Sequence, residues 1–211
     1  MSGRWLIIGG GPSRVRWADA MNGEGRVRVA CANAGIDVCR DAGLYTQWVW
    51  LSDPVAIARY AGSVRDMRER GTQLATSDTA VINIETAGLT VDLAFHTPAI
   101  AGRHPFVYRS WCRPMFSGLM LLQAVVNTQD VREVALAGFD GYAAGEKNHG
   151  DNEGIIRPFM QSMVEALPRV RFVWVAEPRY AISGDNVEVV ENDERRLDDE
   201  TGMTADERAW L

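Results

Sequence analysis

Short apolar runs recur along the chain, and most of them are followed by a glycine or a polar residue. Runs of this length, bounded by such residues, are typical of strands that are buried on both faces of a sheet. We therefore predict strands at residues 6–8, 27–32, 47–51, 74–75, 80–84, 133–137 and 171–175.

Segments with helical character lie between most of these runs. Ser52, Asp53 and Pro54 are residue types that begin helices, and Gly71 is a residue type that ends them. Residues 86–114 show no clear periodicity, and we expect an irregular insert there. The helices that we predict are residues 35–42, 54–70, 117–127 and 155–167.

Strands and helices alternate almost throughout the chain, which predicts a mostly parallel sheet with helices on both faces. The predicted fold class is therefore α/β, as a single Rossmann-like nucleotide-binding domain over residues 1–182. From residue 183 the composition becomes acidic and poor in large apolar residues. We expect residues 183–211 to form an acidic, solvated C-terminal tail. Docking of Trp210 and Leu211 on a neighbouring surface is the alternative.

Composition and charge narrow the class of partner. The chain of 211 residues carries a formal net charge of −6, so no global basic field favours nucleic acid. The apolar run at residues 119–126 is far shorter than the ~20 residues of a membrane-spanning helix, so we expect no membrane span. Cys31, Cys39 and Cys112 are too scattered for a disulfide framework or a zinc site, which favours a cytoplasmic location. Homo-oligomerisation is left open.

The most distinctive stretch is "WLIIGGGPSRVRW", in which a predicted strand runs into Gly9, Gly10 and Gly11. A strand that ends in glycine and feeds a helix leaves backbone N–H groups facing one point, and phosphate is the usual ligand there. Pro12 suits the first turn of that helix, and Ser13 adds a hydroxyl donor. A tight turn without any ligand is the alternative interpretation.

Two better-known phosphate motifs are excluded. The dinucleotide fingerprint G-x-G-x-x-G needs a glycine where Arg14 stands, and no G-K-[ST] follows as a Walker loop requires. Arg14 also belongs to a local group of arginines with Arg16, Arg26 and Arg28. That group is the basis for an alternative in which the chain contacts nucleic acid directly.

Five short motifs follow one another along the chain: "LIIGGGPS", "ACANAG", "WLSDP", "FSGLMLLQAVV" and "REVALAGFDGY". Their order and spacing over roughly residues 4–175 resemble two related groups. One is the bacterial sialyltransferases that use CMP-sialic acid on lipooligosaccharide, and the other is the proteins similar to archaeal 6-hydroxymethylpterin pyrophosphokinase. The chain is shorter than a typical sialyltransferase of this type and has an acidic tail in place of a basic one. This difference weighs against a lipid-linked acceptor.

The resemblance implies a nucleotide site at the carboxyl edge of the sheet, where open parallel sheets bind their ligands. It assigns Asp140 and Tyr142, which follow a later strand, to the catalytic group. It assigns nucleotide binding to residues at strand ends and helix starts: Gly9, Gly10, Gly11, Pro12, Ser13, Asn33, Ser52, Asp53, Ser117 and Gly118.

The sialyltransferase-like interpretation implies transfer of a sugar from a nucleotide-sugar donor, with a CMP-sugar favoured, to an acceptor that the sequence does not identify. His149, in the loop after Asp140, is the candidate general base because histidine titrates near neutral pH. Tyr142 would donate to the departing phosphate. An ordinary exposed histidine is the alternative for His149. This interpretation needs neither a metal ion nor a permanently bound cofactor.

Two other functions stay open. An ATP-dependent pyrophosphokinase would need Mg²⁺, for which Asp53 and Asp140 are the candidate ligands. Helix capping and loop hydrogen bonding are the structural alternatives for these two carboxylates. A catalytically idle nucleotide-binding module would keep the glycine turn and lack the base.

Overall fold

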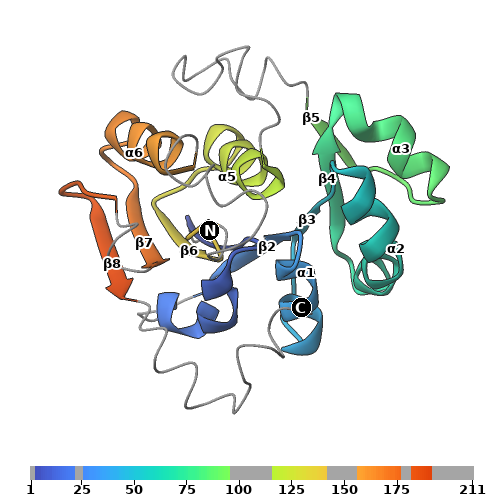
Figure 1. The fold of residues 1–211 in the computed structure, drawn as a ribbon, viewed down its shortest axis with the longest axis horizontal. Helices are drawn as coiled ribbons and strands as arrows, with labels where there is room; N and C mark the ends of the chain where they lie inside the picture. Colours follow the sequence, from blue (N-terminus) through green and yellow to red (C-terminus); the bar gives the residue numbers. More distant parts are fainter. Residues whose placement is uncertain (1–2, 22–25, 96–115, 142–155, 177–181, 192–211) are drawn as a thin grey trace.

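The protein is built around one eight-stranded sheet in the order β5-β4-β3-β2-β1-β6-β7-β8. The computed structural model describes residues 3–21, 26–95, 116–141, 156–176 and 182–191. All neighbouring strands in the sheet pair in parallel (Figure 1). The strands are β1 (Arg4–Ile8), β2 (Arg28–Ala32), β3 (Trp48–Trp50), β4 (Gln73–Ser77), β5 (Leu93–Phe95), β6 (Glu133–Ala137), β7 (Arg171–Ala176) and β8 (Val187–Glu191).

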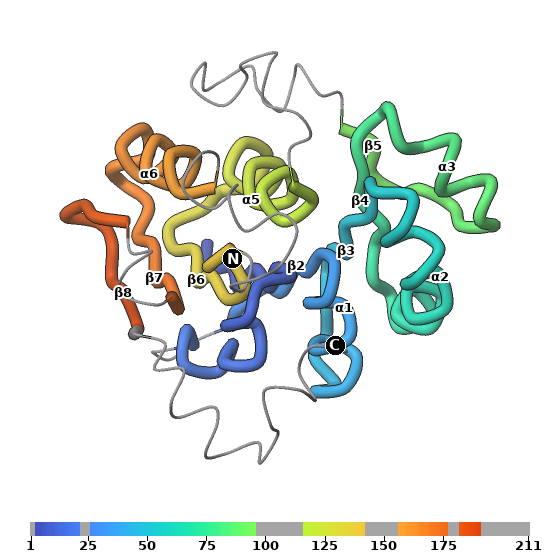
Figure 2. Tube along the Cα trace, viewed as in Figure 1, coloured from blue at the N-terminus to red at the C-terminus, as the bar shows by residue number. Residues whose placement is uncertain are grey.

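The order of the strands changes direction at β1. The chain runs outward from β1 through β2, β3 and β4 to β5, and then returns to place β6 on the other side of β1 (Figure 2). Such a reversal leaves a crevice at the carboxyl ends of the two central strands, because the connections that leave them diverge to opposite faces. The carboxyl ends of β1 and β6 are therefore the expected ligand edge.

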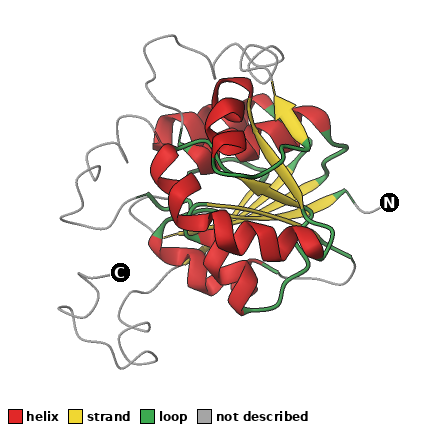
Figure 3. Ribbon diagram, turned by 90° about the vertical axis from the view of Figure 1, so that its right-hand side faces the viewer, coloured by secondary structure: helices red, strands yellow, loops and turns green. Residues whose placement is uncertain are grey.

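Helices cover both faces of the sheet, as the alternating pattern predicted (Figure 3). One face carries α5 (Ser117–Thr128) and α6 (Arg157–Ala166). The other face carries η1 (Pro12–Ala20), α1 (Gly35–Asp41), α2 (Pro54–Glu69), η2 (Asp78–Ala80) and α3 (Val81–Thr86). The predicted α/β fold class, a single Rossmann-like domain with a parallel sheet, is confirmed.

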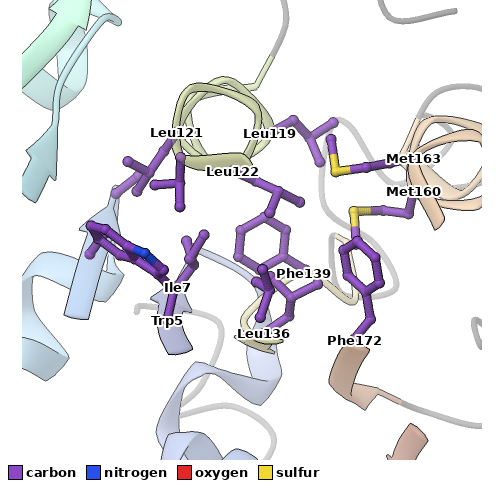
Figure 4. Packing of buried hydrophobic residues seen from close by; sticks show 14 of the residues in the cluster. Trp5, Ile7, Leu119, Leu121, Leu122, Leu136, Phe139, Met160, Met163 and Phe172 are labelled. Carbon is purple, nitrogen blue, oxygen red and sulfur yellow. The ribbon is translucent and has the colours of Figure 1, made fainter. Parts of the chain in front are cut away.

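The central strand β1 shows why its sequence is apolar without interruption. Trp5 and Ile7 point to the face covered by α5 and α6, whereas Leu6 and Ile8 point to the opposite face. Figure 4 shows Trp5 and Ile7 beneath α5, whose residue Leu121 packs over them. A strand buried on both faces needs apolar residues at every position, so "WLII" shows no alternation.

Two elements differ from the sequence-based prediction. Residues 80–84, predicted as a strand, are helical and belong to η2 and α3. Their β-branched residues favour a strand locally, but the segment is the crossover that joins the parallel strands β4 and β5, and such crossovers are usually helical. The three-residue strand Leu93–Phe95 lies where we expected an irregular insert, and it is too short to give a clear pattern.

The sheet also extends past the boundary that we expected at residue 183. Val187–Glu191 forms β8, which pairs in parallel with β7 over five residue positions. The apolar residues of β8, among them Val187, pack on the sheet in a segment whose overall acidity suggested a solvated tail. The described part of that segment therefore belongs to the sheet, and residues 192–211 lie outside the described residues. None of the described helices has the length and apolar character to cross a bilayer.

Candidate functional site

A cavity of about 250 Å³ lies at the carboxyl ends of β1, β2 and β6. This position is the switch point of the sheet, where ligands of open α/β folds bind. The cavity brings together several residues that the sequence pointed to: Gly10, Gly11, Pro12, Asn33 and Gly118. Its other described lining residues are Arg14, Ala34, Tyr60, Phe116, Leu119, Gly138, Phe139, Gly141 and Ile156.

Two backbone hydrogen bonds hold the glycine turn after β1 to the end of β6. The Gly9 N–H donates to the carbonyl oxygen of Ala137 at 2.8 Å, and the Gly11 N–H donates to that of Gly138 at 2.9 Å. The Gly10 N–H has no acceptor among the described residues. The turn therefore offers the N–H of Gly10 to a ligand, rather than the row of N–H groups that the sequence suggested.

Glycine is required at two of these positions by the protein's own backbone. A Cβ at Gly9 would lie 2.4 Å from the Gly138 carbonyl oxygen. A Cβ at Gly11 would lie 2.5 Å from a carboxylate oxygen of Asp140 and 2.9 Å from the carbonyl oxygen of Gly141. The close neighbour that excludes a side chain is thus the loop after β6.

The turn leads into η1, which is a 3-10 helix with a kink at Arg16, and not into the α-helix that we expected. Pro12 occupies its first turn, as predicted. A short 3-10 helix aligns its peptide dipoles less well than an α-helix does. Any bound anion must therefore be held by specific donors more than by a helix dipole.

Ser13 lies beneath the turn and is fully buried. Its hydroxyl oxygen accepts from the Gly138 N–H at 2.9 Å, and it lies 2.9 Å from Asp140 Oδ1 and 3.0 Å from the Val175 carbonyl oxygen. Ser13 does not line the cavity. Its position gives it a structural role that joins η1 to the ends of β6 and β7, instead of the phosphate contact that we expected.

Asp140 is the partner of Ser13 and is 6% exposed. Its carboxylate accepts from the Ser13 N–H, with Oδ2 at 3.0 Å. Burial raises the pKa of Asp140 to about 6, although the hydrogen bonds from Ser13 and the charge of Arg14 act in the opposite direction. Asp140 stands behind the cavity wall rather than on it, so direct contact with a substrate is not its role in this geometry.

Asn33 follows β2 and lies on the cavity wall. Its φ angle of 54° is in the left-handed region, which asparagine tolerates better than most residues. Among the described residues, it alone combines a positive φ with a side chain. Strained backbone of this kind is concentrated at functional sites, and here it sets the Asn33 side chain next to Gly10.

The remaining predicted residues make hydrogen bonds that connect or cap the elements around the cavity. The hydroxyl oxygens of Ser52 and Ser117 lie 3.0 Å apart and join the end of β3 to the start of α5. Asp53 caps α2, since its carboxylate accepts from the backbone N–H groups of Val55 at 2.8 Å and Ala56 at 3.0 Å. The capping alternative thus describes Asp53. None of these three lines the cavity, whereas Gly118 does.

Among the lining residues that were missing from the predicted site, Arg14 and Tyr60 carry polar side chains. Arg14 donates from Nη1 to the carbonyl oxygens of Gly10 and Gly11, each at 3.2 Å. The sequence held one signal for Arg14, which stands where the dinucleotide fingerprint G-x-G-x-x-G has its third glycine. Tyr60, on α2, is 5% exposed, and burial raises the pKa of its hydroxyl. Its sequence position shows only the inward face of an amphipathic helix, so the pattern does not distinguish it from a core residue.

Tyr142 and His149, the candidate donor and base, lie outside the described residues. Their roles remain predictions. Gly141, which immediately precedes Tyr142, does line the cavity. In the described part of the chain, no group of three His, Cys, Asp or Glu side chains is arranged to hold a metal ion. Both carboxylates considered for Mg²⁺, those of Asp53 and Asp140, are engaged in the hydrogen bonds described above.

The fold and site define a Rossmann-like α/β domain with a cavity at its switch point. No protein-family model matches the chain, and no curated protein matches it significantly. Among solved structures, MAf glycosyltransferase from Magnetospirillum magneticum AMB-1 is similar, with a TM-score of 0.55 and 14% sequence identity. The match covers 89% of this chain and 33% of that chain, so this chain spans about a third of its length. At this identity the similarity shows a shared fold.

Proposed function

We propose that the chain is a nucleotide-dependent glycosyltransferase domain that binds the phosphate of a nucleotide-sugar, most favourably a CMP-sugar, at the glycine turn. The observation that carries this proposal is the convergence of three groups on one cavity. Gly10, whose N–H has no acceptor among the described residues, Arg14 and Asn33 all line it. Together they supply donors and positive charge for an anion.

The character of the wall supports an anionic ligand with an apolar part. Arg14 is the charged residue among the described lining residues, and no described carboxylate lines the cavity. Phe116, Leu119, Phe139 and Ile156 supply an apolar surface suited to a base or a sugar ring. The volume of about 250 Å³ lies below the ~300–1,000 Å³ usual for larger ligands. This size suits a nucleoside with one phosphate better than a dinucleotide.

The reaction follows from these positions. A base removes the proton from an acceptor hydroxyl, the acceptor oxygen bonds to the anomeric carbon, and the bond from that carbon to the phosphate oxygen breaks. The departing phosphate keeps the electron pair of that bond and is stabilised by Arg14 and the Gly10 N–H. His149 is the proposed base and Tyr142 an additional donor. Both follow Gly141 in the sequence, and Gly141 lines the cavity.

Two further observations favour this function over its alternatives. A pyrophosphokinase needs carboxylates free for Mg²⁺, whereas Asp53 caps a helix and Asp140 is buried against Ser13. Two of the four arginines that suggested nucleic acid, Arg14 and Arg28, also lie at opposite ends of the sheet. Arg14 faces the cavity, while Arg28 lies at the opposite end of the sheet with its guanidinium 5.5 Å from the Trp5 ring. The glycosyltransferase named above provides support from fold similarity.

A thermal-shift panel tests the proposal. The ligands are CMP, CMP-sugars, UDP-sugars, GDP-sugars and ATP, each with and without Mg²⁺. A ligand that binds only the folded state stabilises it by about 2.7 kcal/mol at ~100 times its dissociation constant. We expect CMP and CMP-sugars to raise the melting temperature equally in EDTA and in Mg²⁺. Stabilisation by ATP alone, and only with Mg²⁺, would replace this function by the pyrophosphokinase. An unchanged melting temperature with every ligand would refute nucleotide binding.

A further inference from the structure

The buried Ser13 hydroxyl lies close to two acceptor oxygens, one of them on Asp140, but it can donate a hydrogen bond to only one of them. A hydroxyl group has one hydrogen to donate and two lone pairs that accept. The Ser13 oxygen lies 2.9 Å from Asp140 Oδ1 and 3.0 Å from the Val175 carbonyl oxygen, both within hydrogen-bond distance. With an ionised Asp140, the single hydrogen serves one of these contacts. The other contact then brings two acceptors together.

A proton on Asp140 removes this conflict. Oδ1 then donates to the Ser13 oxygen, and the Ser13 hydroxyl donates to the Val175 carbonyl oxygen. The Ser13 oxygen still accepts from the Gly138 N–H, and Asp140 Oδ2 still accepts from the Ser13 N–H at 3.0 Å. Every short contact in the group becomes a hydrogen bond. Such full pairing is the rule for buried polar groups.

We propose that Asp140 is a positioning residue that, when protonated, donates a hydrogen bond to Ser13 and so fixes the glycine turn, and that it binds this proton more tightly when an anion occupies the turn. The assignment of an anion to the cavity rests on the proposed function. The arrangement of hydrogen-bond donors around Ser13 does not rest on the proposed function.

The charges around Asp140 explain the link to an anion. Arg14, on η1, is the charged group that the described residues place near it, and this guanidinium favours the ionised form. The elements β6 and β7 face Asp140 and Ser13 with backbone groups, those of Gly138 and Val175. A bound anion competes for the charge of Arg14 and adds a like charge near the carboxylate. Both effects favour the protonated acid.

The closeness of Asp140 to the turn makes this effect local. A Cβ at Gly11 would lie only 2.5 Å from Asp140 Oδ1, so the carboxyl group backs directly on the turn. Burial raises the pKa of Asp140 to about 6 in the ligand-free protein. If the anion binds about tenfold more tightly when Asp140 is protonated, linkage predicts affinity about sixfold weaker at pH 7.5 than at pH 5.5.

Asp140→Asn is a matched variant for the test. An asparagine amide reproduces the protonated acid, because its NH₂ group can donate to the Ser13 oxygen while its carbonyl oxygen accepts from the Ser13 N–H. The variant should keep the turn and lose the titration. The probe is the methyl ester of CMP, a phosphodiester whose single charge does not change between pH 5.5 and 7.5.

The first measurement follows the carboxyl carbon of Asp140 by NMR in the ligand-free wild type as the pH is varied. We expect a midpoint near 6, and a carboxylate that is already ionised below pH 5 would overturn the proton assignment. This result does not depend on any ligand, on the variant or on the proposed function.

The second measurement compares calorimetric affinities for the methyl ester of CMP at pH 5.5 and 7.5. We expect about sixfold weaker binding at the higher pH for the wild type and less than a twofold change for Asp140→Asn. Equal pH dependence in both proteins would overturn the link, because another group would then carry the proton. No binding at either pH would contradict the proposed function and the link together, while the NMR midpoint would still decide whether Asp140 holds a proton.

Discussion

The guanidinium group of Arg14 folds back over Gly10, and its Nη1 atom donates to the Gly10 carbonyl oxygen at 3.2 Å. It also donates to the Gly11 carbonyl oxygen at the same distance. The Arg14 side chain is therefore held over the glycine turn that precedes η1, and it places a positive charge at the cavity wall. A charge fixed before the ligand arrives needs less reorganisation on binding.

Replacement of Arg14 should weaken nucleotide binding. A hydrogen bond to a charged group contributes about 1.5–3 kcal/mol, so we expect Arg14→Gln to raise the dissociation constant for CMP about tenfold or more. Isothermal titration calorimetry measures this change. Arg169→Gln is the matched control, because Arg169 is exposed and precedes β7 at the opposite edge of the sheet. Equal affinity of the wild type and Arg14→Gln would place the phosphate elsewhere.

Substitution of Gly11 should destabilise the fold itself. The added Cβ of Gly11→Ala would overlap the carboxylate of Asp140 and the carbonyl oxygen of Gly141, at 2.5 and 2.9 Å. Overpacking of this kind typically costs about 1–3 kcal/mol. Urea denaturation gives the free energy of unfolding.

Gly62→Ala is the control for that measurement. Gly62 lies within α2, and a Cβ there meets nothing within 4 Å. Alanine in a helix interior is more favourable than glycine by about 0.5–1 kcal/mol, so this variant should be slightly more stable than the wild type. If Gly11→Ala proved as stable as Gly62→Ala, the close packing of the turn against the β6 loop would be wrong.

The sequence predicted where the site lies better than it predicted what each residue does. Alternating strands and helices give the parallel sheet, and the carboxyl ends of parallel strands must share one edge, so Gly10 and Asn33 could be placed together. What a Cβ added at a glycine would contact, by contrast, depends on which strand lies beside that glycine. The chain does not reveal that β6 returns beside β1, and so the burial of Ser13 against Asp140 could not be foreseen. Tyr60 was hidden for a different reason, because the inward face of an amphipathic helix carries core residues and site residues alike.

The stability of the fold should depend on pH through Asp140. Burial raises its pKa from the ordinary value of 3.8 to about 6, so the folded protein binds this proton more tightly than the unfolded chain does. The resulting stabilisation is fully present below pH 3.8 and is lost as the pH rises through about 6. Its full size is about 3 kcal/mol.

Unfolding in urea at several pH values measures this contribution. Asp140→Asn cannot titrate, so the wild type should lose about 2.4 kcal/mol relative to the variant between pH 4 and pH 7. Groups that titrate elsewhere in the chain act on both proteins and cancel in the difference. A difference that stayed constant over this range would show that Asp140 titrates alike in the folded and unfolded states.

Transfer should proceed without a metal ion. In the proposed reaction the departing phosphate is met by Arg14 and backbone donors, so a chelator removes nothing that the site uses. We expect the rate of sugar transfer from a CMP-sugar in excess EDTA to equal the rate in Mg²⁺. Complete loss of transfer in EDTA would favour the metal-dependent alternative, and the capping role of Asp53 would then have to change on ligand binding.

The last prediction concerns His149. His149 follows Gly141 in the sequence, and Gly141 lines the cavity, so we expect this histidine to reach an acceptor bound at the same edge. Loss of a general base typically lowers turnover by about 10² or more, and we expect this from His149→Ala. The affinity for nucleotide should change little, because the glycine turn follows a different strand. His104→Ala, which precedes β6 in the sequence, is the control and should retain wild-type turnover. Wild-type turnover of His149→Ala with a true acceptor would remove the base assignment, whereas loss of nucleotide affinity together with turnover would indicate a binding role instead.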